Sequence, residues 1–152
     1  MEVSVENFIV RAAVPSDIPA IYALICEMEE QTLPYQPFAA ILQRQLHNPD
    51  YCCFVCEAAG MVAGVLNLRV EEQLHHAGMV AEIMELAVKN GFRSMGIGKR
   101  LIDAARQTAE SLGCIHLEVS SNQRRTRAHA FYERQGLRKT HKTFTRSLAG
   151  ME

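Results

Sequence analysis

The sequence predicts an α/β fold built on a mixed sheet, in a single domain spanning residues 1–152. Segments with strand-like and helix-like patterns alternate along the chain, and a strand, a glycine-rich turn and a helix follow one another near its middle. Hydrophobic residues make up 48% of the 152 positions, which is enough for one sizeable core. No repeat, low-complexity tract or interdomain linker interrupts this order.

The N-terminal part predicts one strand and two helices. Residues 8–14 read as a short strand, and the hydroxyl of Ser16 suits the cap of a helix over residues 18–28, where apolar side chains recur at helical spacing. Prolines around residues 34–37 interrupt the chain. Residues 38–47 then predict a second helix.

The middle of the chain predicts three strands. Residues 51–70 form two β-rich runs around a turn at Gly60, and an antiparallel hairpin is their simplest arrangement. A loop containing His75 and His76 leads to a third long strand over residues 79–88.

The C-terminal part returns to alternating elements. Helices are predicted over residues 98–112 and 124–136, each closed by a glycine, with a strand over residues 114–120 between them. Residues 137–148 predict a last strand or two.

The five cysteines predict neither a disulfide framework nor a zinc site. Their number is odd and the chain is of ordinary size, whereas disulfide frameworks are typical of small chains with paired cysteines. Cys53 and Cys56 have the spacing of half a zinc site, but no second half follows, and in an extended segment their side chains would point to opposite faces. We therefore expect buried thiols.

Neither a membrane span nor a signal peptide is apparent. No apolar run approaches the roughly 20 residues that a span requires, and residues 1–10 contain acids and no basic region. We therefore expect a cytoplasmic protein without a membrane partner.

Charge is divided unevenly along the chain, although the net charge is only −1. Residues 1–90 carry 12 acidic and 4 basic side chains, whereas residues 91–152 carry 5 acidic and 12 basic ones. This division suits an anionic ligand held by the second part, and two ordinary solvated faces would explain it equally well. Nucleic acid is not expected as the partner, because the basic residues lack interleaved aromatics.

The turn at residues 93–99 has the composition of an anion-binding site. It follows a predicted strand and opens a helix, so unpaired N–H groups and the positive end of the helix dipole meet there. Glycines permit close approach of a ligand and basic side chains add charge. These residues are Arg93, Gly96, Gly98, Lys99 and Arg100. A pyrophosphate would fit, whereas a turn that only joins a strand to a helix needs no basic flanks.

Two familiar phosphate loops do not match this turn. The Walker A pattern requires serine or threonine after Gly98-Lys99, where this chain has Arg100. The dinucleotide-binding pattern requires a third glycine, where this chain has Leu101. Neither an NTPase nor a dehydrogenase is therefore predicted.

Three segments together resemble the GNAT N-acetyltransferase superfamily. Arg93-x-x-Gly96-x-Gly98 after EIMELAV is similar to its acyl-CoA signature, and Asn122 after HLEVS and the segment AFYERQGL (130–137) agree in order and spacing. The resemblance implies helices on both faces of a splayed mixed sheet and acetyl-CoA as co-substrate, with pyrophosphate on the turn and pantetheine along the preceding strand. The cofactor-binding residues it implies are Leu86, Ala87, Val88, Arg93, Ser94, Met95, Gly96, Ile97, Gly98, Lys99 and Asn122.

The same resemblance implies two catalytic residues. Glu82 lies where members of the superfamily often carry a glutamate in a basic role, and Tyr132 lies where they carry a tyrosine that protonates the departing thiolate. Glu82 and Glu85 are three apart on a presumed strand, so we expect them on opposite sides, with at least one only solvated or ion-paired. Tyr132 could otherwise pack its ring in the core with its hydroxyl in water.

A narrower resemblance concerns the acceptor. The segments QLHHA, AEIMELAV, AHAFY and THKTFTRSL are similar to those of aminoalkylphosphonate N-acetyltransferases within the superfamily. This similarity implies a small aminophosphonate as acceptor, a divalent metal, and acceptor binding by His75, His76 and His129. Glu71 and Glu72 depart from the pattern, and their charge would disfavour a dianionic phosphonate.

Three functions stand as hypotheses. The first is a small-molecule amine N-acetyltransferase, with an aminoalkylphosphonate as the leading acceptor. The second is a GNAT enzyme that acts on a protein or peptide amine, and the third is a noncatalytic acyl-CoA-binding or regulatory domain. A homodimer is left open as the assembly.

Overall fold

The computed structural model describes residues 7–121 and 125–149, which fall into two compact units. Residues 1–119 form the first unit, which contains the sheet and the helices α1 to α3. Residues 120–152 form the second unit, which contains the helix α4. That residues 1–152 act as one domain stays a prediction.

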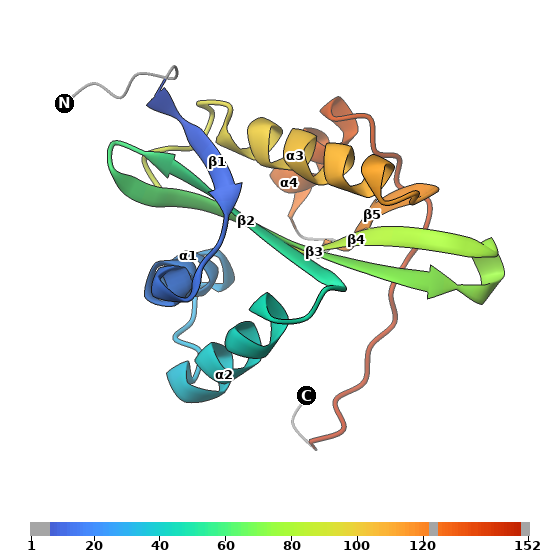
Figure 1. The fold of residues 1–152 in the computed structure, drawn as a ribbon, viewed down its shortest axis with the longest axis horizontal. Helices are drawn as coiled ribbons and strands as arrows, with labels where there is room; N and C mark the ends of the chain where they lie inside the picture. The colour runs from blue at the N-terminus through green and yellow to red at the C-terminus, as the bar shows by residue number, and fades with distance from the viewer. Residues whose placement is uncertain (1–6, 122–124, 150–152) are drawn as a thin grey trace. The chain divides into compact units, whose positions relative to one another are not determined.

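The sheet of the first unit is mixed, as predicted. Its five strands lie in sequence order, and neighbours are antiparallel except for β4 and β5, which are parallel. The strands are β1 (Ile9–Ala12), β2 (Tyr51–Ala58), β3 (Met61–Gln73), β4 (Gly78–Val88) and β5 (His116–Val119). Figure 1 shows the β3–β4 hairpin extending past its neighbouring strands.

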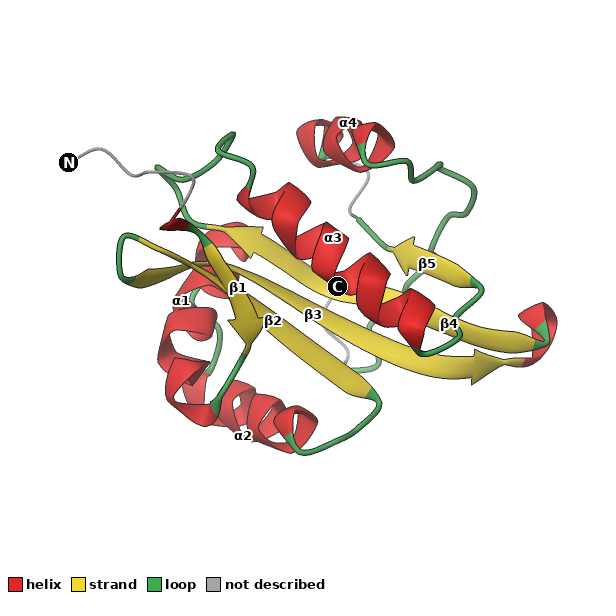
Figure 2. Cartoon of the chain, turned by 45° about the horizontal axis from the view of Figure 1, so that its top comes forward, coloured by secondary structure: helices red, strands yellow, loops and turns green. Residues whose placement is uncertain are grey.

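Helices cover both faces of this sheet (Figures 1 and 2). α1 (Ile18–Glu29) and α2 (Tyr35–Leu46) pack against one face, and α3 (Ile97–Ser111) packs against the other. Short 3₁₀ turns at Pro15–Asp17 and Leu74–His76 precede α1 and follow β3. No helix in the described part of the chain is both long and apolar enough to cross a bilayer. The predicted α/β fold is confirmed.

Apolar side chains fill the space between the sheet and its helices. Beneath α1 and α2 the buried cluster comprises Ile18, Ile21, Leu24, Ile25, Leu42, Cys53, Val55, Val65 and Ala87. On the other face, Gly64 lies under the start of α3, where an added Cβ would come within 2.7 Å of Ile97 Cγ2. The missing side chain at Gly64 therefore lets the first turn of α3 approach the sheet.

The predicted serine cap of α1 is wrong, because the N-cap residue of α1 is Asp17, which makes no side-chain capping bond to this helix. The side chain of Ser16 makes no capping bond. The Asp17 carboxylate instead accepts hydrogen bonds from the Val14 N–H at 2.8 Å and from two Arg11 nitrogens at 2.7 and 2.8 Å. An ionised carboxylate accepts more strongly than a hydroxyl, and Arg11 holds it in place.

Other element boundaries differ little from those predicted. α2 begins three residues early, since Pro37 lies in its first turn, where a backbone N–H is not needed. The hairpin turn between β2 and β3 consists of Ala59 and Gly60, with φ of 53° and 75°. Two left-handed residues are typical of the type I′ turn that suits the twist of a hairpin.

The strand predicted over residues 137–148 is wrong. The second unit contains α4 (Thr126–Arg134), and residues 137–149 form neither helix nor strand. Two large apolar side chains of this segment, Phe144 and Leu148, are 92% and 95% exposed. A strand needs a hydrogen-bonded neighbour and an apolar face to bury, and the described residues give this segment neither.

The cysteines of the described residues are free thiols, and the expectation that they are buried is confirmed for two of them only. Cys53 and Cys56 are buried, whereas Cys26, Cys52 and Cys114 are half-buried. Burial raises the pKa of the Cys53 thiol to about 12, so this side chain is neutral at physiological pH.

Candidate active site

A β-bulge in β4 brings two carboxylates to one face of the sheet. The register between β3 and β4 shifts at Met84, so that Arg69 pairs with Glu82 and Asn67 pairs with Glu85. Asn67 and Arg69 are two apart on β3 and share a face, and their partners share it with them. The prediction that Glu82 and Glu85 face opposite sides is therefore wrong.

Polar side chains continue across this face beyond the apolar core. Since paired residues lie side by side and residues two apart share a face, the strand register places eight polar residues together. We call them the polar strip: Asn67, Arg69, Glu71, Gln73, Glu82, Glu85, His116 and Glu118. The strip contains four carboxyl groups and one guanidinium group.

Glu85 lies at the inner end of the strip, next to the apolar core. Its Oε1 accepts a hydrogen bond of 2.9 Å from Asn67 Nδ2, which also donates to Gln45 Oε1 of α2 at 2.9 Å. Burial raises the pKa of Glu85, and the charges of Glu29 and Glu82 add to this rise, while the bond from Asn67 opposes it. A raised pKa brings the carboxylate nearer to the range in which it can accept a proton at working pH.

Glu82, the base predicted from the sequence, is held in an ion pair. Its Oε1 lies 2.9 Å from Arg69 Nη2, and the same nitrogen lies 3.4 Å from Glu71 Oε2. The Glu82 carboxylate is therefore already engaged by a side chain of the protein, and a catalytic role of Glu82 stays a prediction.

Two buried polar atoms of the strip lack a hydrogen-bond partner among the described residues. They are Asn67 Oδ1 and Arg69 Nε. An unpaired buried polar atom costs roughly 1–3 kcal/mol. Native proteins keep few such atoms, and those they keep call for a specific reason such as function.

The residues predicted to bind the cofactor begin where β5 leaves β4. The parallel ladder ends at Ile83 and Val119, whereas β4 continues beside β3 for five further residues. Within the described residues this last part of β4 has no strand partner on the β5 side. It contains the residues predicted to pair with pantetheine: Leu86, Ala87 and Val88. The splaying of the sheet that the resemblance implies is thus confined to the second half of β4.

The turn after β4 has the backbone of an anion site. Ser94 and Gly96 have positive φ of 67° and 88°, and Gly96 is the N-cap of α3. The amides of residues 97–99 open the helix, so they have no carbonyl in a preceding turn. No atom lies within 4 Å of a Cβ placed on Gly96, which leaves space above the turn. The turn brings together the predicted residues Ser94, Met95, Gly96, Ile97, Gly98 and Lys99.

The three basic side chains near the turn are directed differently. Arg93 is exposed, and its Nε donates to the carbonyl of Val88 at 3.3 Å. Lys99 is exposed and pairs at 2.9 Å with a carboxylate one helical turn further along. Arg100 donates to the Phe8 carbonyl at 3.3 Å, and its guanidinium lies 5.5 Å from the Phe8 ring centroid. Arg93 and Lys99 are thus the better placed to meet a phosphate.

Two predicted site residues lie in the second unit, and one lies outside the described residues. Tyr132 and His129 belong to α4, whereas Asn122 is not among the described residues. Burial raises the pKa of the Tyr132 phenol, and Arg125 partly opposes the rise. The phenol therefore stays protonated at neutral pH, as a proton donor must. The roles of all three residues stay predictions.

The histidines of the β3–β4 hairpin form a cluster at its tip. The ring centroids of His75 and His76 lie 4.3 Å apart, and that of His76 lies 4.6 Å from that of His116. A strand rises roughly 3.3 Å per residue, which puts the tip roughly 20–25 Å from Glu85. The structure gathers these histidines but does not bring them to Glu85, and acceptor binding by His75 and His76 stays a prediction.

The described residues offer no ready site for the metal implied by the narrower resemblance. Within residues 7–121 and 125–149, no three histidine, cysteine or acidic side chains are placed to hold a metal ion. The clustered imidazoles contact one another through their rings.

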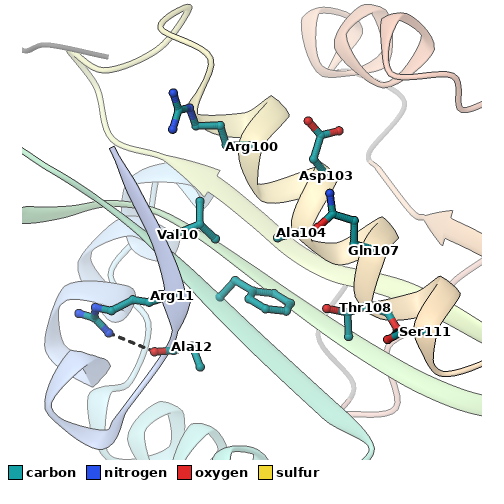
Figure 3. Close-up of a pocket in the computed structure, with 10 residues that line it drawn as sticks. Val10, Arg11, Ala12, Arg100, Asp103, Ala104, Gln107, Thr108 and Ser111 are labelled. Atoms are coloured by element: carbon teal, nitrogen blue, oxygen red, sulfur yellow. Dashed lines mark hydrogen bonds between the residues drawn. The ribbon is translucent and has the colours of Figure 1, made fainter. Parts of the chain in front are cut away.

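A groove of about 710 Å³ lies elsewhere, between β1 and α3 (Figure 3). Val10, Ala12 and Phe54 line it from the strands, and Gln107 and Thr108 are among the polar side chains from α3. Arg100, from the end of the predicted anion-binding turn, also lines it, and the groove lies on the opposite face of the sheet from the polar strip.

The sequence of this chain matches a known family. Residues 18–137 match the Acetyltransferase (GNAT) family. The chain is 35% identical over 138 residues to the aminoalkylphosphonate N-acetyltransferase of Salmonella typhimurium, a match that covers 91% of this chain and 90% of that protein. The chain therefore belongs to the GNAT family and is an acetyl-CoA-dependent N-acetyltransferase.

Solved structures agree with the fold. An aminoglycoside N-acetyltransferase in complex with CoA has a TM-score of 0.84 at 16% identity, with 97% of each chain covered. An aminoglycoside acetyltransferase from an uncultured soil metagenomic sample has a TM-score of 0.79 at 24% identity, covering 94% of this chain and 97% of that one. These likenesses confirm the GNAT fold.

The residues around Glu85 were not identified from the sequence, namely its hydrogen-bond partner Asn67, the Gln45 that Asn67 also contacts, and Glu29. Asn67 lies in the apolar run VLNLRV, and a lone amide in such a run is a signal that could have been used. Glu29 is exposed and Gln45 is half-buried on a polar stretch of α2. A polar residue at such a helix position does not stand out in the sequence.

Proposed function

We propose that the protein acetylates the primary amine of a small molecule, with Glu85 as the proton acceptor. The observation that supports this proposal best is the position of Glu85, a carboxylate of raised pKa next to the part of β4 that β5 leaves unpaired. Pantetheine is proposed to run along that edge, which would bring the thioester close to Glu85.

The reaction requires that the amine lose a proton. Glu85 would take this proton, directly or through a water molecule. The neutral amine then attacks the thioester carbonyl carbon, so that a C–N bond forms and the C–S bond breaks. The departing thiolate takes a proton, for which Tyr132 is the proposed donor, and the products are the N-acetyl compound and CoA. Backbone amides at residues 96–99 are proposed to hold the pyrophosphate.

The leading acceptor is a short aminoalkylphosphonate. This substrate class appears in the name of the relative that is 35% identical over most of the chain. Histidines would hold the phosphonate oxygens by hydrogen bonds, and holding the oxygens would position the amine. We propose His129 for this role, with His75 and His76 as the alternative.

A second acceptor class is favoured by the charge of the polar strip. The strip carries four carboxyl groups, and its one guanidinium, on Arg69, is paired with Glu82 and Glu71. Such a surface attracts cations and repels a dianion. An amine with a second positive charge is therefore the alternative to the phosphonate.

A panel of acceptors separates these possibilities. Specificity constants should be measured for aminomethylphosphonate, an uncharged alkylamine, a short diamine and a lysine-containing peptide, with and without a chelator. Preference for the phosphonate supports the leading proposal, and preference for the diamine supports the alternative. Preference for the peptide would replace the small-molecule proposal with a protein or peptide acceptor. Loss of activity with the chelator would show a metal requirement.

The role of Glu85 is tested by its pH–rate profile. A base acts in its ionised form, so the rate should fall as pH falls through the pKa of Glu85, and this acidic limb should lie above the ordinary glutamate value of about 4.3. Glu85→Gln should lower kcat/KM at neutral pH by about 10²- to 10⁴-fold and remove the limb. Glu82→Gln is the matched variant and should keep it. If Glu82→Gln loses the limb and Glu85→Gln keeps it, the base predicted from the sequence is restored.

A further inference from the structure

We propose that Asn67 is a positioning residue for acetyl transfer, which holds the Glu85 carboxylate ionised through its side-chain amide while Gln45 fixes that amide. This proposal rests on Glu85 being the base, as proposed above.

The amide of Asn67 is oriented by its two acceptors. Asn67 is 5% exposed, and Nδ2 donates to Glu85 Oε1 and Gln45 Oε1, both at 2.9 Å. Its Oδ1 has no partner among the described residues. Turning the amide over would set this oxygen against two other oxygens, so both N–H donors stay engaged. Asn67 therefore acts toward Glu85 as a donor.

The bulge in β4 creates this contact. Without the register shift, Met84 would lie opposite Asn67, and Glu85 would fall on the α3 face of the sheet. The extra residue turns the Glu85 carboxylate onto the polar strip and sets it beside the amide.

The surroundings of Glu85 otherwise favour its neutral form. Glu29 of α1 and Glu82 of the same strand are like charges, and Cys53 of β2 is a buried neutral thiol. The nearby cation Arg69 is engaged by Glu82. The Asn67 amide is the hydrogen-bond donor that opposes this environment, since a bond donated to the ionised form favours that form.

The proposal predicts how the loss of Asn67 changes the enzyme. In Asn67→Leu, which is close in shape and lacks a donor, Glu85 should remain protonated to a higher pH. The acidic limb of the kcat/KM profile should move upward by about one pH unit. At a pH on the limb, kcat/KM should then be about tenfold lower than in the wild type, and the difference should disappear at higher pH. Gln45→Leu keeps the donor but frees the amide, and should give a smaller shift in the same direction.

The experiment is a carbon-13 NMR titration of the glutamate carboxyls, with Glu85→Gln assigning the Glu85 signal, alongside pH–rate profiles of the same proteins. Equal upward shifts of the Glu85 titration and of the acidic limb support the proposal. An unshifted titration, or a loss of activity equal at every pH, would overturn it, because a merely structural role lowers the rate without moving the limb.

Two further results keep the test decisive. If Asn67→Leu does not fold, Asn67→Asp has the same shape and replaces the donors with an acceptor, and it should shift the titration further upward. If the Glu85 titration moves while the rate profile does not, the contact stands and Glu85 is not the base. That outcome overturns the catalytic role of Asn67 together with the proposed base.

Discussion

Asp17 joins the first strand to the first helix through one nearly buried carboxylate. The residue is 6% exposed, and bonds from Arg11 chiefly, and from the Val14 N–H, lower its pKa. Asp17→Asn removes the negative charge to which the Arg11 guanidinium and the Val14 N–H donate. We expect the free energy of unfolding at pH 7 to fall by about 1–3 kcal/mol.

The loss of stability in Asp17→Asn should be present at neutral pH and should disappear in acid. Because the pKa of Asp17 is lower in the folded state, its carboxylate stabilises the protein above the unfolded value of about 3.9, and the contribution is lost as pH falls through the folded value. Urea unfolding should show the two proteins differing at pH 7 and converging in acid. Glu110→Gln, which removes an exposed ion pair with Arg106, is the control and should cost less than about 1 kcal/mol. A difference that persists unchanged in acid would contradict this account.

Tyr132 should matter for turnover more than for binding. Its pKa is raised by burial, so the phenol keeps its proton at neutral pH and can give it to a developing thiolate. Tyr132→Phe should lower kcat by about 10²-fold or more and change KM little, because the lost interaction is made in the transition state. Steady-state kinetics with acetyl-CoA varied measure both constants. Equal kcat in the variant would leave the ring with a packing role only.

Two glycines at opposite ends of α3 form a matched pair: Gly96 precedes the helix and Gly113 follows it. Gly96 and Gly113 have φ of 88° and 84°, and neither would meet an atom within 4 Å if it carried a Cβ. Alanine at either position should therefore cost similar backbone strain, about 1–2 kcal/mol. Only Gly96 adjoins the amides proposed to hold the pyrophosphate.

We therefore expect Gly96→Ala to weaken acetyl-CoA binding by about tenfold or more, since its methyl group would enter the space where a phosphate would lie. Gly113→Ala should bind acetyl-CoA like the wild type. Calorimetric titration measures affinity, and thermal unfolding checks that both variants lose similar stability. Equal affinities in the two variants would show that the turn is only structural.

The elements themselves could be predicted because their signals are local. The hairpin around Gly60, the strand before the turn and the helix after it follow from alternation, helical spacing and turn residues. The strand predicted over residues 137–148 fails because a strand also depends on a neighbour that sequence pattern does not name.

The candidate site was only partly predictable for the same reason. The turn predicted to bind the cofactor is one continuous segment, so its residues could be named from the sequence, and their binding role stays a prediction. The face of Glu85 depends on the bulge at Met84, a property of two paired strands. Its bond to Asn67 and the link to Gln45 join three separate elements, and no spacing within one segment reveals them.

The whole chain separates charge between the two proposed binding sites. Residues 1–90 have a net charge of −8 and include six of the eight residues of the polar strip, whereas residues 91–152 have a net charge of +7 and include the turn proposed to hold the pyrophosphate. Acetyl-CoA is polyanionic, so salt should weaken its attraction and raise its KM. The acceptor should respond to salt according to its own charge.

The sign of that response tests the acceptor class. Carboxyl groups on the strip attract a diamine and repel a phosphonate, and salt screens both effects over a Debye length of about 10 Å at 0.1 M. Between low salt and about 0.2 M the acceptor KM should rise for a diamine and fall for a phosphonate. Glu118→Gln removes one strip charge and should reduce either slope, changing KM at low salt about two- to fivefold. Glu110→Gln, on the opposite face of the sheet, should leave the slope unchanged. If Glu118→Gln and Glu110→Gln reduce the salt dependence of the acceptor KM equally, the net charge of the protein and not the polar strip determines that dependence.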